Sequence, residues 1–190
     1  MTDDTEDAII KPISITPKDY AQNFEFAPLN EPLGAIVMAF AQLEGKLTMT
    51  INALLSIDHR EGVALEDLMQ SATARIKLFH TLAVLKTSGI FLEKLNGKTG
   101  LRVKLQKCND LRNDYIHGLW TGFNCTGDSF TKVRYKADTG LHPVKSTINV
   151  SVPDLWEAHQ FIFGTALELE TWRFAYNHRN HPEHWLSPAA

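Results

Sequence analysis

Cysteine is scarce in this sequence, which argues against a disulfide framework. The 190 residues include two cysteines, Cys108 in a predicted helix and Cys125 in a turn-rich segment, and neither has metal-ligand or CxxC spacing. Long hydrophobic runs are also missing, because no stretch approaches the roughly 20 apolar residues that a helix needs to cross a bilayer. The opening residues, MTDDTED, are acidic where a signal peptide is basic. We therefore expect a cytoplasmic protein with no membrane partner.

An excess of positive charge is missing too, which argues against a protein that coats nucleic acid. The formal net charge is −3, but much of the negative charge lies in the first seven residues, so the rest leaves room for a local basic groove. The motifs of nucleotide hydrolases, serine esterases and zinc proteases do not occur. With 44% hydrophobic and 22% charged residues, the composition is typical of one globular domain.

The chain divides into an arm, a folded domain and a tail. Residues 1–30 mix acidic residues, prolines and isolated apolar residues without a periodic pattern, so we expect a flexible acidic N-terminal arm. The folded domain is expected over residues 31–178. Residues 179–190 form a C-terminal tail that loses the helical pattern at Pro182.

Four helical patterns dominate the expected domain. Apolar residues recur at spacings of three and four in the segments 33–55, 65–87, 99–117 and 153–176. Within 120–152, apolar and polar residues alternate between turn sequences, which predicts a small antiparallel hairpin or flap. The predicted fold is therefore mainly α: a four-helix bundle with a β insertion before its last helix.

The last predicted helix carries two apolar stripes. One consists of Leu155, Ile162, Ala166 and Leu169, and the other of Trp156, Phe163, Leu167 and Phe174. Because a helix buries the faces that are apolar, this helix is expected to be buried on more than one side.

The most informative stretch is LRNDYIHGLW, residues 111–120. At about 100° per residue, Arg112 falls near the middle of an apolar helix stripe, where a leucine would be expected. Burying an unpaired guanidinium is costly, so this position implies a carboxylate partner, a second chain or a wet cleft. Glu44 interrupts the stripe of the first helix in the same way. We predict that Glu44 and Arg112 face each other, either as a structural ion pair or closing a polar pocket.

His117 lies in the last turn of the same predicted helix, with Gly118 as its C-terminal cap. The negative end of a helix favours a protonated imidazole, and Asn113 lies one turn earlier. An isolated histidine at a helix end is more often a simple cap than a catalyst. An arginine five residues before a histidine occurs four times in the chain, at Arg75, Arg112, Arg173 and Arg179. Spacing alone therefore does not identify a site, and the setting of Arg112 is what separates this copy from the others.

The stretch RNDYIHGLW resembles the signature of the HEPN superfamily of helical domains: an arginine, usually a polar residue such as asparagine, a short spacer and a histidine. The resemblance covers this motif and a compatible helix order over residues 32–178. It implies a metal-independent endoribonuclease without a cofactor, acting as a homodimer whose two motifs face each other. The alternative is a non-catalytic module of this fold that binds RNA, a nucleotide or a protein. By position, Arg112 and His117 would be the catalytic pair and Asn113 the polar residue after the arginine.

RNA can be cut without a metal when a base takes the proton of the 2′-hydroxyl and an acid protonates the departing 5′-oxygen, leaving a 2′,3′-cyclic phosphate. A histidine can take either role, and an arginine offers several donors to the phosphate oxygens. One chain supplies one such histidine, so a symmetric dimer would supply the second group. A ribonuclease of this kind would suit a toxin or a phage-defence factor, with an inhibitory protein partner covering its cleft.

Further RNA contacts are expected from Lys104 and Lys107 on the same helix, and from the Trp120 ring, which offers a stacking surface. The alternative is that Lys104 and Lys107 belong to an ordinary solvated helix face and that Trp120 is an ordinary strand residue. Three histidines near the end of the chain, His178, His181 and His184, invite a metal site. Helical spacing is missing there and a proline intervenes, so no metal is expected.

Overall fold

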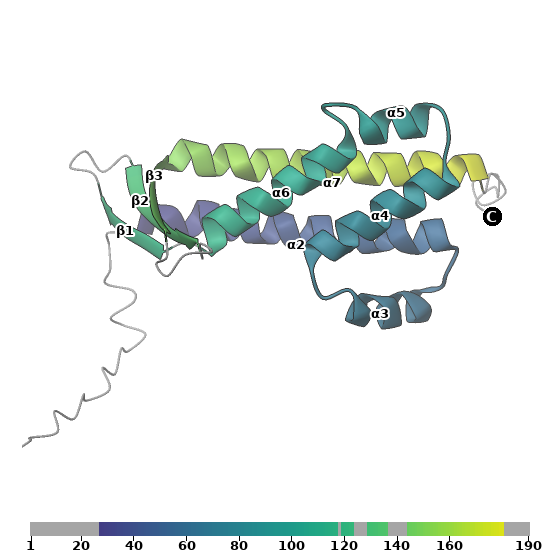
Figure 1. The fold of residues 1–190 in the computed structure, drawn as a ribbon, viewed down its shortest axis with the longest axis horizontal. Helices are drawn as coiled ribbons and strands as arrows, with labels where there is room; N and C mark the ends of the chain where they lie inside the picture. The colour runs from purple at the N-terminus through teal and green to yellow at the C-terminus, as the bar shows by residue number, and fades with distance from the viewer. Residues whose placement is uncertain (1–26, 118, 124–128, 137–143, 181–190) are drawn as a thin grey trace, which may run out of the picture.

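The computed structural model describes residues 27–117, 119–123, 129–136 and 144–180. The helices are α2 (Ala27–Leu55), α3 (His59–Leu68), α4 (Ala72–Lys86), α5 (Ile90–Asn96), α6 (Leu101–Ile116) and α7 (Val152–Asn180), and the strands are β1 (Leu119–Phe123), β2 (Ser129–Lys136) and β3 (Val144–Ser151). The chain is therefore mainly helical with a small antiparallel sheet, as predicted (Figure 1). Most of the predicted arm, most of the tail and Gly118 lie outside the described residues.

Helices α2 and α7 form the centre of the molecule. Each has 29 residues, and both start at the end that holds the sheet and run in the same direction (Figure 1). Lys46 of α2 and Glu170 of α7 form an ion pair across their contact. Both helices contribute buried apolar side chains to the core, including Ile36, Leu43, Leu47, Ile162 and Leu169. None of the described helices has a segment both long and apolar enough to cross a membrane.

Helices α4 and α6 complete the core. Helix α4 packs on α2 and α6, and α6 packs on α2, α4 and α7 while running back toward the sheet (Figure 1). The single helix predicted over 65–87 is wrong, because the chain breaks between α3 and α4. Ser71 caps the start of α4, where its hydroxyl accepts a hydrogen bond from the Ala74 N–H at 3.1 Å. The segment before α6, which was not predicted to be helical, forms α5 after Gly89, whose φ of 56° suits glycine.

The first helix starts at Ala27, before the domain boundary expected at residue 31. Pro28 and Pro32 hid this extension in the sequence, because prolines early in a helix resemble those of a loop. Leu29 is buried in the core and links the extra turn to the rest of the molecule. The burial of one leucine stabilises such a turn by about 1.5–3 kcal/mol.

The predicted β insertion is a three-stranded antiparallel sheet in the order β1-β2-β3. Trp120 of β1 lies opposite Lys132 of β2, which lies opposite Ile148 of β3. Phe130 and Val150 are buried and join the sheet to the helical core. Because β1 follows α6 and β3 runs directly into α7, the sheet lies at the C-terminal end of α6 (Figure 1).

Candidate active site at the end of helix α6

The side chains of helix α6 become more exposed toward its C-terminal end. Its first half buries Leu101, Leu105 and Cys108, whereas the residues from 111 to 116 are half-buried. The helix ends at His117, which has φ −96° and ψ 9° and donates its backbone N–H to the Asn113 carbonyl at 3.3 Å. The exposed imidazole is therefore fixed at its backbone and open to solvent at its ring.

Arg112, Asn113 and His117 come together as the motif predicts. Arg112 Nη1 donates to His117 Nε2 at 2.8 Å and to Asn113 Oδ1 at 3.0 Å. A guanidinium has no acceptor, so Nε2 must accept and Nδ1 carries the ring proton. In this contact the imidazole is therefore the hydrogen-bond acceptor, through Nε2. The Phe40 ring supports the guanidinium from α2, with 5.5 Å between the ring centroid and the guanidinium carbon.

The predicted pair between Glu44 and Arg112 is wrong. Glu44 Oε1 lies 3.5 Å from Arg75 Nη1, and Arg75 Nε donates to the Met69 carbonyl at 3.0 Å. Among the residues that the structure describes, the ion pairs do not include Glu44 with Arg112. The sequence showed two charges on apolar stripes but not that α4 packs on α2 and brings its own arginine to Glu44. Arg112 avoids the free-energy cost of full burial in another way, because it is half-exposed and lies over an aromatic ring.

The other copies of the arginine–histidine spacing have different surroundings. Arg75 binds Glu44, while His80 Nε2 lies 3.0 Å from Asn96 Oδ1. Arg173 lies 3.8 Å from the Glu170 carboxylate and over the Phe174 ring. The histidine of the fourth copy lies outside the described residues. The copy on α6 is therefore the one whose arginine and histidine are seen in direct contact.

The two lysines predicted to bind RNA are engaged by α7. Lys104 pairs with Glu168, and Lys107 Nζ lies 4.4 Å from the centroid of the Phe161 ring. Lys104 is eight residues before Arg112, about 12 Å along the helix. A role for either lysine in RNA binding stays a prediction, because each would have to leave or share its present contact.

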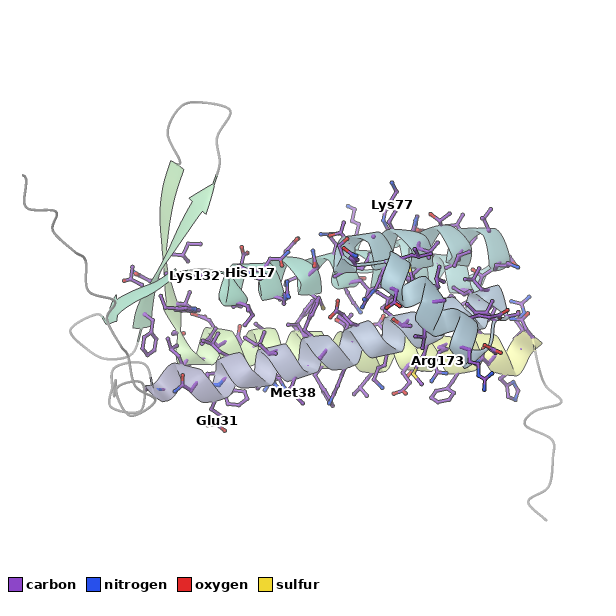
Figure 2. All side chains as sticks on the ribbon, turned by 90° about the horizontal axis from the view of Figure 1, so that it is seen from below. Glu31, Met38, Lys77, His117, Lys132 and Arg173 are labelled. Carbon is purple, nitrogen blue, oxygen red and sulfur yellow. The ribbon has the colours of Figure 1, made fainter. Side chains whose placement is uncertain are left out.

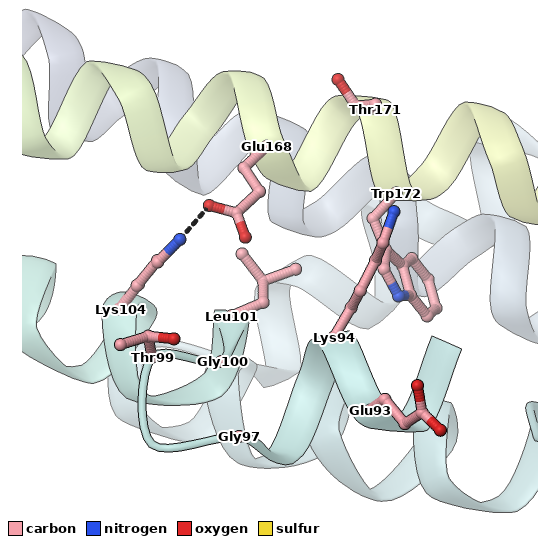
Figure 3. A pocket seen from close by; sticks show the side chains of 10 residues that line it. All are labelled: Glu93, Lys94, Gly97, Thr99, Gly100, Leu101, Lys104, Glu168, Thr171 and Trp172. Carbon is pink, nitrogen blue, oxygen red and sulfur yellow. Dashed lines mark hydrogen bonds and ion pairs between the residues drawn. The ribbon is translucent and has the colours of Figure 1, made fainter. Parts of the chain in front are cut away.

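Lys104 and Glu168 line a hollow of about 360 Å³ at the start of α6, the opposite end from His117 (Figure 3). Its walls come from α5, the α5–α6 turn, α6 and α7, and they carry Glu93, Lys94, Leu101 and Trp172. Charges of both signs line it, so its electrostatics favour neither an anion nor a cation. The hollow is therefore separate from the motif.

The sheet is fastened to the last turn of α6 by an aromatic cluster around a buried lysine. Lys132 is 2% exposed, and its Nζ lies 5.2 Å from the Tyr115 ring centroid and 5.7 Å from that of Trp120. Trp120 Nε1 donates to the Tyr115 carbonyl at 3.1 Å. Burial raises the pKa of the Tyr115 hydroxyl, and nearby carboxylates add to this. Lys132 and His117 therefore share one end of the molecule (Figure 2).

Sequence reasoning missed two supports of the motif, Phe40 and Lys132. Phe40 belongs to the apolar pattern of the first predicted helix, and Lys132 to the alternating pattern of the predicted β insertion. The predicted stacking role of Trp120 stays a prediction, because its half-buried ring already borders Lys132. No pattern in the sequence reports that a particular ring lies beneath a particular cation.

Cys108 is excluded as a nucleophile at neutral pH. Its side chain is buried, and burial raises the pKa of the thiol to about 11, so the reactive thiolate is not populated. Among the described residues no group of three or more histidines, cysteines or carboxylates is arranged as a metal site. His181 and His184, considered as ligands from the sequence, lie outside those residues.

Comparison with known protein families finds no matching family model, and comparison with curated proteins and with solved structures finds no match either. What indicates a function is therefore the geometry of the α6 end.

Proposed function

We propose that this chain is a metal-independent endoribonuclease of the HEPN type. In this proposal α2, α4, α6 and α7 form the HEPN-like four-helix bundle, and Arg112 and His117 cut RNA. The observation that supports it best is the 2.8 Å contact between Arg112 Nη1 and His117 Nε2 at an exposed helix end. This contact places a group that transfers protons beside a cation that binds phosphate.

The reaction follows from the donors and acceptors of the two side chains. Among the described residues Arg112 uses Nη1 for its hydrogen bonds, so Nε and Nη2 remain to bind the phosphoryl oxygens. As Arg112 turns to the phosphate, His117 Nε2 loses its donor and can accept the proton of the 2′-hydroxyl. The 2′-oxygen then bonds to phosphorus while the bond to the 5′-oxygen breaks, and Arg112 stabilises the charge on the phosphoryl oxygens. The products are a 2′,3′-cyclic phosphate and a 5′-hydroxyl.

The departing 5′-oxygen needs a proton, and in our proposal a second copy of the chain donates it. Among the described residues of α6, its C-cap and the sheet, His117 is the one histidine. In a homodimer whose two α6 ends face each other, one copy supplies the base and the other the acid. Asn113 holds the Arg112 guanidinium in place through its amide oxygen. We place this activity in the cytoplasm, in toxin or phage-defence biology, with an inhibitory protein that covers the shared cleft.

The test compares the wild type with Arg112→Ala and His117→Ala on mixed RNA in EDTA. Each substitution is expected to lower the cleavage rate by about 10²–10⁴-fold, the usual contribution of a group that transfers protons or stabilises charge. His80→Ala is the matched control, because His80 belongs to the Arg75 copy of the same spacing and contacts Asn96 instead. Circular dichroism shows whether each variant stays folded.

A folded His117→Ala variant that cuts RNA at the wild-type rate contradicts the proposal. A wild type that binds RNA without cutting it supports the alternative, a non-catalytic module of the same fold.

A further inference from the structure

One of the two apolar stripes of α7 is left uncovered by the part of the chain that the structure describes. Leu155, Ile162, Ala166 and Leu169 are buried against the core, as the sequence predicts. On the other stripe, Phe163 is 43%, Leu167 46% and Phe174 44% exposed, while Trp156 is half-buried. The predicted burial on two sides therefore needs something outside the described part of this chain.

Helix α2 adds apolar residues beside this stripe. Met38 is 62% and Met49 55% exposed. At about 100° per residue, both methionines lie on the side of α2 opposite Phe40, the ring that supports Arg112. Met38 accordingly points away from the side that holds His117 (Figure 2). We call Met38, Met49, Trp156, Phe163, Leu167 and Phe174 the outer face.

The two halves of the outer face meet along the seam between α2 and α7. The Lys46–Glu170 ion pair marks this seam. Around α7, Glu170 is within about 60° of Phe163 and Leu167, and around α2, Lys46 is within about 80° of both methionines. The exposed apolar residues of the two helices therefore lie on both sides of the same seam, on the side away from α6.

The α7 stripe is symmetric about its own middle. Phe163 and Leu167 are at equal distances from Thr165 along the helix, and so are Trp156 and Phe174. If two α7 helices pack antiparallel about a two-fold axis at this level, Phe163 meets Leu167 of the second copy and Trp156 meets its Phe174. An isologous interface requires such a self-complementary surface.

The stripe also permits close packing along its flank, where Gly164 lies about 80° around α7 from the middle of the stripe. Gly164 is exposed, and a Cβ built on it would have nothing within 4 Å. Two helices can approach closely where a glycine replaces a larger side chain. The position beside the two-fold axis is thus open on both copies.

The size of the outer face suits a second copy. The stripe from Trp156 to Phe174 rises about 27 Å, and two helices side by side span about 20 Å, which gives a footprint of about 500 Å² per chain. Two copies would bury about 1,000 Å² in total, the lower bound of a specific interface.

We propose that a second copy of this chain docks on the outer face, with the two α7 helices antiparallel around a two-fold axis near residue 165. This contact goes beyond the proposed ribonuclease, because the outer face is turned away from α6 and leaves both Arg112–His117 pairs open. A chain that also uses the motif-to-motif contact has two different two-fold interfaces and assembles beyond a dimer.

The first test measures molar mass in solution by light scattering or sedimentation at micromolar concentration. The wild type should exceed the 21.4 kDa of one chain. Phe163→Glu combined with Leu167→Glu should halve the number of copies and raise the dissociation constant at least tenfold, because four carboxylates would meet at the centre of the contact. Leu85→Glu is the matched control: Leu85 is 74% exposed on α4, outside the outer face, and the variant should keep the wild-type mass.

The second test measures whether the two α7 helices meet near residue 165, at the proposed two-fold axis. In a Cys125→Ser background, Gly164→Cys should form a disulfide between copies under mild oxidation, whereas Leu85→Cys should not. The buried Cys108 stays in place as an internal thiol.

Three results would overturn the proposal. They are a monomeric wild type, a glutamate variant with the wild-type mass, and a Gly164→Cys protein that cross-links no more than its control. If the wild type is monomeric and self-associates only after residues 1–26 or 181–190 are removed, the chain's own end covers the outer face and the second copy does not. The RNA result is independent, because Arg112→Ala and His117→Ala leave the outer face intact.

Discussion

At the residue scale, the contacts of the Arg112 guanidinium with described residues include no carboxylate. The structure shows it with the Asn113 amide oxygen, the His117 imidazole and the Phe40 ring. A carboxylate in this place would neutralise the cation and compete with phosphate. The failure of the Glu44 prediction thus strengthens the case for an anion-binding arginine, because Glu44 binds Arg75 instead.

Asn113→Asp tests this reading of the arginine. The substitution keeps the size of the side chain but puts a negative charge 3.0 Å from Arg112 Nη1, where the amide oxygen now lies. We expect RNA cleavage to fall by about tenfold or more, since a charged partner holds the guanidinium more strongly than a neutral one. Asn113→Ala, which removes the contact without adding charge, should lose less. An aspartate variant that is as active as the wild type would show that Arg112 does not bind the phosphate.

The three residues of the motif could be placed from the sequence because they belong to one helix end, where spacing fixes neighbours. The partner of Glu44 could not be placed, since it depends on how α4 packs against α2. The same holds for Phe40 and Lys132, which reach the motif from other elements. The sequence pattern therefore predicted which residues are neighbours within one helix, but it did not predict contacts between different elements.

At the element scale, α7 begins with a reciprocal cap between the end of the sheet and the helix. The Asp154 carboxylate accepts hydrogen bonds from the Ser151 N–H at 2.8 Å and hydroxyl at 2.7 Å, and the Asp154 N–H donates back to that hydroxyl at 3.3 Å. This is a capping box, which satisfies backbone donors that a helix start leaves unpaired. The last helix was predicted to start at residue 153, and the structure confirms this start within one residue.

Asp154→Asn tests the cap through its pH dependence. The hydrogen bonds from Ser151 hold the pKa of Asp154 below its ordinary value of 3.8. The carboxylate therefore stabilises the fold above its unfolded pKa, and this stabilisation is lost as the pH falls through the lowered folded pKa. At pH 7 the asparagine variant should lose about 1 kcal/mol in the free energy of unfolding. The difference from the wild type should vanish in acid, and a difference that is the same at every pH would contradict the role of the charge.

The sequence predicted some of these elements and missed others. Long stretches with helical apolar periodicity predicted α2, α6 and α7, and alternating apolar and polar residues predicted the sheet. Each of these patterns repeats over several helical turns or residue pairs. The break before α4 rests on one serine, and the seven residues of α5 are too few for a periodic signal. Short elements of this kind are decided by the packing around them.

At the scale of the whole molecule, the two proposals rest on two different surfaces. One is the α6 end with Arg112 and His117, and the other is the outer face on α2 and α7. They point in opposite directions, so a ribonuclease built on the first and a contact between copies built on the second can each hold or fail alone. The sequence indicated both, through a charge inside an apolar stripe and through a second apolar stripe on one helix.

The most direct measurement is mass spectrometry of the ends that purified protein creates in a defined RNA oligonucleotide in EDTA. Transfer of the 2′-hydroxyl proton to His117 predicts fragments that end in a 2′,3′-cyclic phosphate and begin with a 5′-hydroxyl, and none from an oligonucleotide with 2′-O-methyl groups throughout. Intact RNA after prolonged incubation, fragments with 5′-phosphates, or cyclic ends formed equally fast by His117→Ala would contradict the account.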